Sequence, residues 1–258
     1  MIPRLAAVSV LALLSLSPPP SQSDDVAALR REVQALRAQQ AAMDRDLQTI
    51  KNLLQQLAAG GAAPAGDPFV SKMIPLANEP TKGNAAAKVT VVEVSDYHCP
   101  FCRRQTLQTL PQLMAEYVNS GKVRYVFVDY PIAQLHPDAF KAHEAADCAG
   151  DQGKYWQMHD ILFTNTPAKD TAQLVSQAQM IGLDTMKFGN CLKGGEHAPA
   201  INASIARMQE LGVGGTPLTL IGLTPLAGAP MKVVTSVYGA KPYAEFKTAI
   251  DAVLAQAK

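Results

Sequence analysis

The stretch that decides the fold is Val91-Val92-Glu93-Val94-Ser95-Asp96-Tyr97-His98-Cys99-Pro100-Phe101-Cys102-Arg103. Its first half belongs to a run of mostly β-branched residues and predicts a buried strand over Lys88 to Ser95. Its second half begins a segment with helical spacing of apolar residues, which extends from Pro100 to about Asn119. The two cysteines therefore lie where a strand turns into a helix.

Cysteines at such a turn suit thiol chemistry. A dithiol catalyst needs one sulfur that is a thiolate near neutral pH and a second sulfur that can resolve a mixed disulfide. At the exposed start of the predicted helix, unpaired backbone N–H groups would favour the thiolate of Cys99. Pro100 suits the first helical turn because it has no N–H to leave unpaired. We therefore predict Cys99 as the nucleophile and Cys102 as the resolving thiol.

Other uses of the same cysteines are open. Half of a zinc site would need a second ligand pair at the right spacing, and Cys148 and Cys191 do not form one. A Cu(I) carrier that binds through Cys99 and Cys102 is chemically reasonable, because thiolates select soft metals. A purely structural disulfide would close too short a loop to stabilise much. Redox catalysis is favoured, with no metal and no cofactor expected.

Around this stretch the sequence predicts a layered α/β domain. A second strand is expected at Val123 to Val128, followed by a helical insertion over about residues 135–212. Strands return at Leu218 to Ile221 and Met231 to Val237, and a helix from Tyr243 to Ala257 closes the chain. This order favours one sheet with helices on both sides.

The first residues have the pattern of an export signal. Arg4 is followed by an apolar stretch from Leu5 to Leu16 and by Pro18 to Pro20, which predicts a signal peptide over residues 1–23. The stretch is short for a bilayer span, although an uncleaved anchor or a buried helix is the alternative. Export would place the four cysteines in an oxidising compartment.

A heptad pattern follows the predicted signal. Residues 24–58 are predicted to form a coiled-coil oligomerisation helix, and residues 59–67 a Gly-, Ala- and Pro-containing linker to a catalytic domain over residues 68–258. The alternative is a lone amphipathic helix that packs on its own domain. The residues at the heptad seam positions, which would face the partner helix, do not distinguish a dimer from a trimer. These positions lie between residues 26 and 57, at Val26, Leu29, Val33, Leu36, Gln40, Met43, Leu47, Ile50, Leu54 and Leu57.

The overall composition is that of an ordinary soluble protein. Hydrophobic residues make up 48% of the chain and charged residues 17%, and the formal net charge is +1. Nucleic-acid binders usually carry a strong basic excess or a basic stripe, and this sequence has neither. No nucleic-acid partner is predicted.

Three motifs in this order carry a family resemblance: the opening stretch, the run Cys148-Ala149-Gly150-Asp151-Gln152-Gly153-Lys154-Tyr155-Trp156-Gln157-Met158-His159-Asp160, and Gly214-Gly215-Thr216-Pro217. From about Val70 onward the chain resembles the DsbA-like thioredoxin-fold thiol-disulfide oxidoreductases. The resemblance implies a thioredoxin fold with a helical insertion, and the roles already given to Cys99 and Cys102.

The resemblance also implies roles for three further residues. Pro217 would follow a cis peptide bond, although an isolated proline is usually trans. Thr216 would offer its backbone to a substrate chain. Glu93, which lies in an otherwise apolar strand, would relay a proton for Cys102. An outward-facing, solvated Glu93 is the alternative, because alternation can leave one strand face wet.

The remaining cysteines and histidines are assigned structural roles. In an oxidising compartment Cys148 and Cys191 are expected to form a structural disulfide, with two free buried thiols as the alternative. Four further histidines show no ligand spacing with one another and are interpreted as structural or surface residues: His136, His143, His159 and His197.

The function predicted from these features is disulfide exchange in exported, periplasmic proteins. The expected partners are cysteine-containing client proteins, a membrane redox partner and other copies of the chain. The coiled coil favours a disulfide isomerase, since several active sites would face a shared space. The alternatives are a dithiol oxidase of the same fold and a periplasmic module that binds Cu(I) or holds unfolded clients.

Overall fold

The computed structural model describes residues 66–257 except 166, 169 and 227, and in the N-terminal part residues 33, 34, 37 and 40, which are helical. The chain divides into two units, Met1–Ala65 and Gly66–Lys258. The predicted signal peptide and most of the predicted coiled coil and linker lie outside the described residues. The second unit contains all four cysteines.

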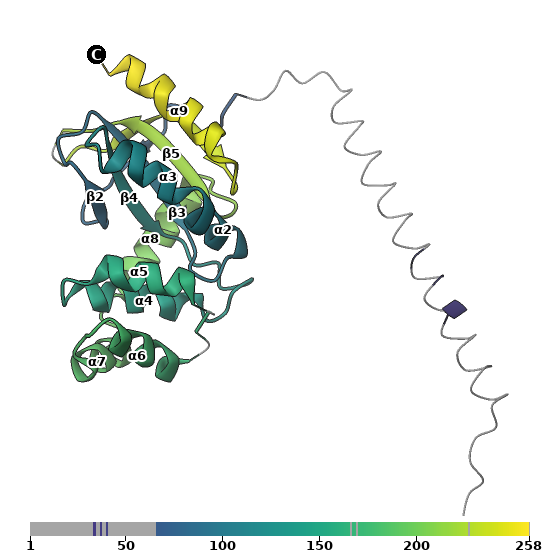
Figure 1. Ribbon diagram of the computed structural model, residues 1–258, viewed down its shortest axis with the longest axis vertical. Coiled ribbons are helices and arrows are strands. Elements are labelled where there is room, and N and C mark those ends of the chain that lie inside the picture. The colour runs from purple at the N-terminus through teal and green to yellow at the C-terminus, as the bar shows by residue number, and fades with distance from the viewer. Residues whose placement is uncertain are drawn as a thin grey trace, which may run out of the picture. The chain divides into compact units, whose positions relative to one another are not determined.

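A six-stranded sheet forms the centre of this second unit (Figure 1). The strands β3 and β4 are parallel, and all other neighbours in the sheet are antiparallel. The order across the sheet is β1 (Met73–Ile74), β6 (Met231–Tyr238), β5 (Leu218–Leu223), β3 (Val89–Ser95), β4 (Val123–Asp129) and β2 (Thr81–Gly83). The sequence predicted the four long strands but not β1 and β2, which are too short to show a periodic pattern.

Helices lie on both faces of the sheet and at one end (Figure 1). One face is covered by α2 (Pro100–Gln108), α3 (Leu110–Leu113), the π-helix η1 (Met114–Val118) and α9 (Tyr243–Gln256). The other face packs against α8 (Ala198–Glu210). The insertion also contains α4 (Ala139–Gly150), α5 (Tyr155–Thr164), α6 (Thr171–Met180) and α7 (Thr185–Gly194). The predicted α/β fold with a helical insertion is confirmed.

The central strand β3 separates two hydrophobic cores. All seven of its residues are buried, as expected for a strand covered on both faces. Val89 and Val91 belong to the core that contains both Cys99 and Cys102, whereas Val92 and Val94 belong to the core on the opposite face. Since side chains alternate along a strand, Glu93 faces the same core as Val91.

The helical segment predicted from Pro100 to about Asn119 is present, and the structure divides it into three consecutive helical elements. Helix α2 ends at Gln108 and α3 begins at Leu110. Pro111, in the first turn of α3, has no N–H to donate to the preceding turn, which interrupts the helical hydrogen bonds. The Thr109 hydroxyl donates to the carbonyl of Lys241 at 3.2 Å and joins this break to the chain ahead of α9.

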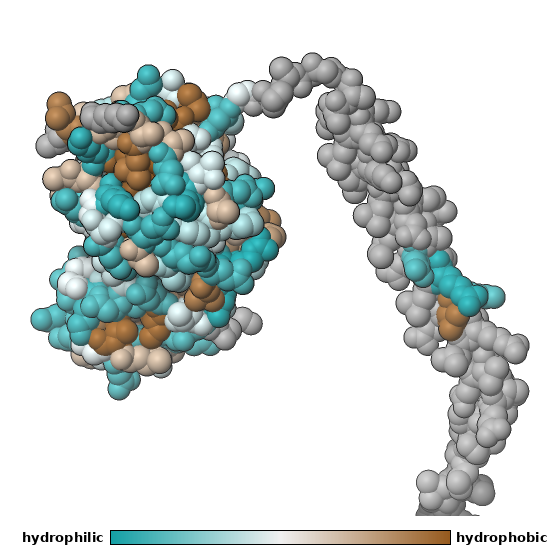
Figure 2. Space-filling model, turned by 45° about the horizontal axis from the view of Figure 1, so that its top comes forward, coloured by the Kyte–Doolittle hydropathy of each residue, from teal (hydrophilic) through white to brown (hydrophobic). Residues whose placement is uncertain are grey.

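Both edges of the sheet are short. The outermost strands, β1 and β2, have two and three residues. Further along β6, the Asp67 carboxylate accepts the N–H of Ser236 at 2.6 Å. On the face shown in Figure 2, hydrophobic residues are scattered among hydrophilic ones. Within the described residues, no helix has both the length and the apolar character needed to cross a membrane.

Candidate active site

Cys99 and Cys102 lie at the start of α2. Cys99 is the N-cap residue, and Pro100 is the first residue of the helix. The turn before it is held by hydrogen bonds to Asp96, whose carbonyl accepts the N–H of Cys99 and whose carboxylate accepts the N–H of His98. Cys99 is only 4% exposed and Cys102 is fully buried. The expectation of an exposed Cys99 was therefore wrong, because the Thr216 loop packs against its sulfur.

The environment shifts the pKa values of the two thiols in opposite directions. A hydrogen bond from the Cys102 thiol is the largest cause that lowers the pKa of Cys99, to about 5. The Thr216 side chain and the backbone N–H groups of Phe101 and Cys102 act in the same direction. Burial is the main cause that raises the pKa of Cys102 well above its usual value. One sulfur is thus favoured as a thiolate at neutral pH and the other as a thiol.

The loop opposite the cysteines contains a cis peptide bond between Thr216 and Pro217. The sulfur of Cys99 lies 3.6 Å from the carbonyl oxygen of Thr216, to which the protonated thiol form of Cys99 can donate. The carbonyl of Pro217 accepts the N–H of Gly239, which follows β6. The structure therefore brings together the pair and the loop that the sequence predicted to face it.

Glu93 is buried, with 1% of its surface exposed. One carboxylate oxygen accepts a hydrogen bond of 2.9 Å from the Tyr125 hydroxyl, and the other has no partner among the described residues. This carboxylate faces the same hydrophobic core as Cys102. The alternative of an outward-facing, solvated Glu93 was wrong, because both faces of β3 are covered.

Two carboxylate–histidine pairs connect the insertion to the ends of β3 and β4, and the sequence did not reveal them. The Asp96 carboxylate contacts His136 Nδ1 at 2.9 Å and also accepts the N–H of Ile132. His143 is fully buried, with Nδ1 hydrogen-bonded to the Asp129 carboxylate. Neither pair has a recognisable sequence motif, because the partners lie 40 and 14 positions apart.

His143 also contacts the turn directly. Its Nε2 accepts the N–H of Tyr97 at 3.4 Å, and its ring lies 4.5 Å from the Tyr97 ring, centroid to centroid. An imidazole that accepts at Nε2 carries its proton on Nδ1, where it can donate to Asp129. His143 therefore holds the backbone two residues before Cys99.

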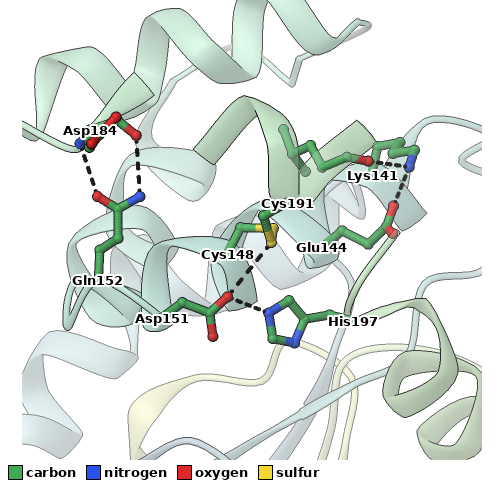
Figure 3. The surroundings of a disulfide bond; sticks show 9 residues. Lys141, Glu144, Cys148, Asp151, Gln152, Asp184, Cys191 and His197 are labelled. Carbon is green, nitrogen blue, oxygen red and sulfur yellow. Dashed lines mark hydrogen bonds and ion pairs between the residues drawn. A yellow bond between two sulfur atoms is a disulfide. The ribbon is translucent and has the colours of Figure 1, made fainter. Parts of the chain in front are cut away.

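The other two cysteines are bonded to each other. Cys148 of α4 and Cys191 of α7 form a disulfide, with their Cα atoms 5.9 Å apart. The bond joins two helices of the insertion. The carboxylate of Asp151 lies beside it and also contacts His197, as Figure 3 shows.

Metal ligands do not gather around the active-site pair. Within the described residues, the groups of three or more potential ligand side chains include neither Cys99 nor Cys102. Among the described His, Cys, Asp and Glu side chains, no third ligand joins Cys99 and Cys102 in such a group.

The fold and this geometry agree with comparisons to known proteins. A family model described as thioredoxin matches residues 76–252, well over half of the chain. The chain belongs to this thioredoxin family. The DsbA-like resemblance is confirmed at the level of the fold by alpha-DsbA1 of Wolbachia pipientis, which aligns over 71% of this chain and 94% of its own with a TM-score of 0.63 and 22% identity.

Two further proteins have higher identity to this chain. A thioredoxin-like oxidoreductase from Silicibacter pomeroyi DSS-3 is 30% identical, with a TM-score of 0.55 over 68% of this chain and 92% of its own. A probable disulfide bond formation protein D of Bacillus anthracis is 27% identical over 57% of this chain and 71% of its own length.

The thioredoxin domain also matches part of much longer proteins. The Na(+)/H(+) antiporter NhaA 1 of Salinispora arenicola is 35% identical over 53% of this chain, and the match covers only 20% of the antiporter's own length. The chain therefore spans about a fifth of the antiporter to which it is similar.

Proposed function

We propose that this protein is an exported thiol-disulfide oxidoreductase that rearranges disulfides in exported proteins through Cys99 and Cys102. The observation that carries the proposal is the opposite shift of the two thiol pKa values, with that of Cys99 at about 5 and that of Cys102 raised by burial. A low-pKa sulfur at a helix start is a good attacking and leaving group in thiol–disulfide exchange.

The proposed exchange conserves electrons when it isomerises a client. The Cys99 thiolate attacks a client disulfide, a bond forms between Cys99 and one client sulfur, and the other client sulfur leaves as a thiolate. That thiolate attacks a different client disulfide, and the last thiolate released attacks the mixed disulfide and frees Cys99. If the rearrangement stalls, Cys102 attacks Cys99, so that the client leaves reduced and the pair becomes a disulfide.

The neighbouring residues have supporting roles in this proposal. Cys102 must lose its proton before it attacks, and its burial makes that loss unfavourable without a base. Glu93 is the proposed proton acceptor, supported by its burial and by its place on the same side of the sheet. Thr216 and Pro217 are proposed to bind the client backbone, supported by the contact between the Thr216 carbonyl and Cys99.

The N-terminal region completes the proposal. Residues 1–23 would direct export to the periplasm, residues 24–58 would form the coiled coil, and residues 59–67 would link it to the domain over residues 68–258. A homo-oligomer would present several Cys99 sulfurs to one client and would limit access of a membrane redox partner to each pair. The support is the heptad pattern alone.

The test compares refolding of scrambled ribonuclease by the full chain and by a truncated chain that begins at Asp67. We expect the full chain to restore ribonuclease activity catalytically, and Cys99→Ser to abolish this. The truncated chain should lose isomerisation, oxidise reduced clients faster and sediment as a monomer. Equal behaviour of the two chains would exclude the isomerase proposal, and stoichiometric Cu(I) uptake without turnover would exclude the oxidoreductase.

A further inference from the structure

A second cluster of ligand-type side chains surrounds the disulfide in the insertion. Cys148 comes from α4, Cys191 from α7, and His197 is the N-cap residue of α8. One potential ligand atom from each of these three residues lies within 4.8 Å of the others. Asp151 Oδ2 is 3.7 Å from the Cys191 sulfur and 2.8 Å from His197 Nε2 (Figure 3).

We propose that reduction of the Cys148–Cys191 disulfide turns this cluster into a binding site for a thiophilic divalent cation such as Zn²⁺. Two thiolates and one imidazole are a donor set that zinc prefers. Asp151, whose carboxylate now contacts His197 Nε2, supplies the fourth ligand when that hydrogen bond is given up. The proposal concerns the insertion and does not depend on the function proposed for Cys99.

The geometry of the helices suits this change. Two thiolates on one tetrahedral zinc ion lie about 3.8 Å apart, since each Zn–S bond is about 2.3 Å. The Cα atoms of Cys148 and Cys191 are 5.9 Å apart, so the sulfurs can separate by side-chain rotation while the helices stay in place. Both cysteines are buried, whereas Asp151 is exposed and His197 is half-buried. The cluster is therefore shielded on the sulfur side and open on the side of the other two ligands.

The chemistry requires an external dithiol or phosphine as the reductant. With a dithiol, the Cys148–Cys191 bond breaks, both cysteines become thiols, and the reductant leaves as its own disulfide. With a phosphine, water supplies an oxygen atom to phosphorus and a proton to each sulfur, and the reductant leaves as the phosphine oxide. Cation binding then displaces two protons to solvent, one from each thiol. While the disulfide is intact, Cys148 and Cys191 provide no thiolate to bind the cation. The cation would replace the covalent link between α4 and α7 when the disulfide is lost.

The experiment uses the full chain with Cys99→Ser and Cys102→Ser, so that Cys148 and Cys191 are the only remaining cysteines. Co²⁺ is the probe, because thiolate ligands give it intense charge-transfer absorption and tetrahedral sites give it strong visible bands. We expect one Co²⁺ per chain after phosphine reduction, displaced by Zn²⁺, and no such bands in the oxidised protein. Absent bands after reduction, or the same bands before it, would overturn the proposal.

Variants identify the other ligands. His197→Ala should weaken Co²⁺ binding by at least about tenfold, whereas the matched control Glu210→Gln, on the exposed side of α8, should bind as before. An unchanged Co²⁺ affinity in His197→Ala would show that the imidazole is not a ligand, and this result would overturn the proposed site. If the reduced chain loses helical circular dichroism, the cation must restore it, and failure to do so also overturns the proposal.

Discussion

The Tyr125 hydroxyl donates a 2.9 Å hydrogen bond to the Glu93 carboxylate, and both residues are buried on the side of the sheet that also holds Cys102. An ionisable group at such a position is costly unless it is paired or has a chemical role. Glu93 can therefore contribute both to the stability of the fold and to proton transfer, and separate experiments can measure the two contributions.

Tyr125→Phe should destabilise the protein by about 1–3 kcal/mol, the usual cost of leaving a buried acceptor without its donor. The substitution removes the only hydrogen bond that the described residues donate to this carboxylate. Urea denaturation of the oxidised protein measures the change. Combining Tyr125→Phe with Glu93→Gln should recover part of the loss, and no recovery would mean that the hydroxyl stabilises something other than the carboxylate.

Glu93→Gln should slow the release of a client from its mixed disulfide with Cys99, because Cys102 would lose its proposed proton acceptor. The rate at which iodoacetamide alkylates Cys99 should stay the same, since alkylation of Cys99 does not require Cys102 to lose its proton. Stopped-flow measurement of mixed-disulfide decay gives the first rate. Equal decay rates in Glu93→Gln and in the exposed-residue control Glu245→Gln would show that Glu93 transfers no proton.

The reduced protein should lose stability relative to the oxidised protein as the pH falls from about 9 to about 5. The folded pKa of Cys99 is lowered from 9.0 to about 5. A depressed pKa adds stability that is fully present above the unfolded value and is lost as the pH falls through the folded value. Thiolate absorbance at 240 nm should titrate with a midpoint near 5, and paired thermal unfolding curves of the two redox forms measure the stability difference. A midpoint near 9 would show that the hydrogen bonds around Cys99 do not stabilise its thiolate.

Replacing Cys148 and Cys191 together by alanine should lower the free energy of unfolding by up to about 4 kcal/mol in the chain-entropy description of a cross-link. The bond closes a loop between residues 43 positions apart, so the unfolded chain gains considerable freedom when it is removed. Chemical denaturation without reductant measures the loss, and activity at a temperature where the variant stays folded should be retained. Loss of activity in the folded variant would assign the pair a role beyond stability.

His143→Phe should keep the packing against Tyr97 and remove both hydrogen bonds of the imidazole. Asp129 is a buried residue, 6% exposed, and its carboxylate would lose this hydrogen-bond partner at a cost of about 1–3 kcal/mol. The turn before Cys99 should also loosen, which amide hydrogen exchange at Tyr97 would detect. The double variant with Asp129→Asn should be more stable than His143→Phe alone. If it is not, the lost stability comes from packing.

The site could be predicted from sequence where its parts are close together in the chain. The β-branched run before Cys99 and the apolar spacing after it identify the strand and the helix start, and the Cys99–Cys102 spacing identifies the pair. The orientation of Glu93 could not be obtained in this way. Because β3 is buried on both faces, its sequence has no polar alternation to show which side a carboxylate takes.

The histidines show where local patterns stop being informative. His136 and His143 gain their partners only when the insertion packs against the ends of β3 and β4. The strands β1 and β2 are defined by their pairing with β6 and β4, with hardly any pattern of their own. The predicted coiled coil rests on periodicity and stays a prediction.

The short edges of the sheet have a consequence for solubility at high concentration. A long unpaired edge strand is a template for intermolecular β-pairing and aggregation. Here an incoming strand would find an outer strand of two or three residues, and at Ser236 it would find an N–H already bound to the Asp67 carboxylate. If the protein acts on partly unfolded clients, as proposed above, these short edges would protect it from co-precipitating with them.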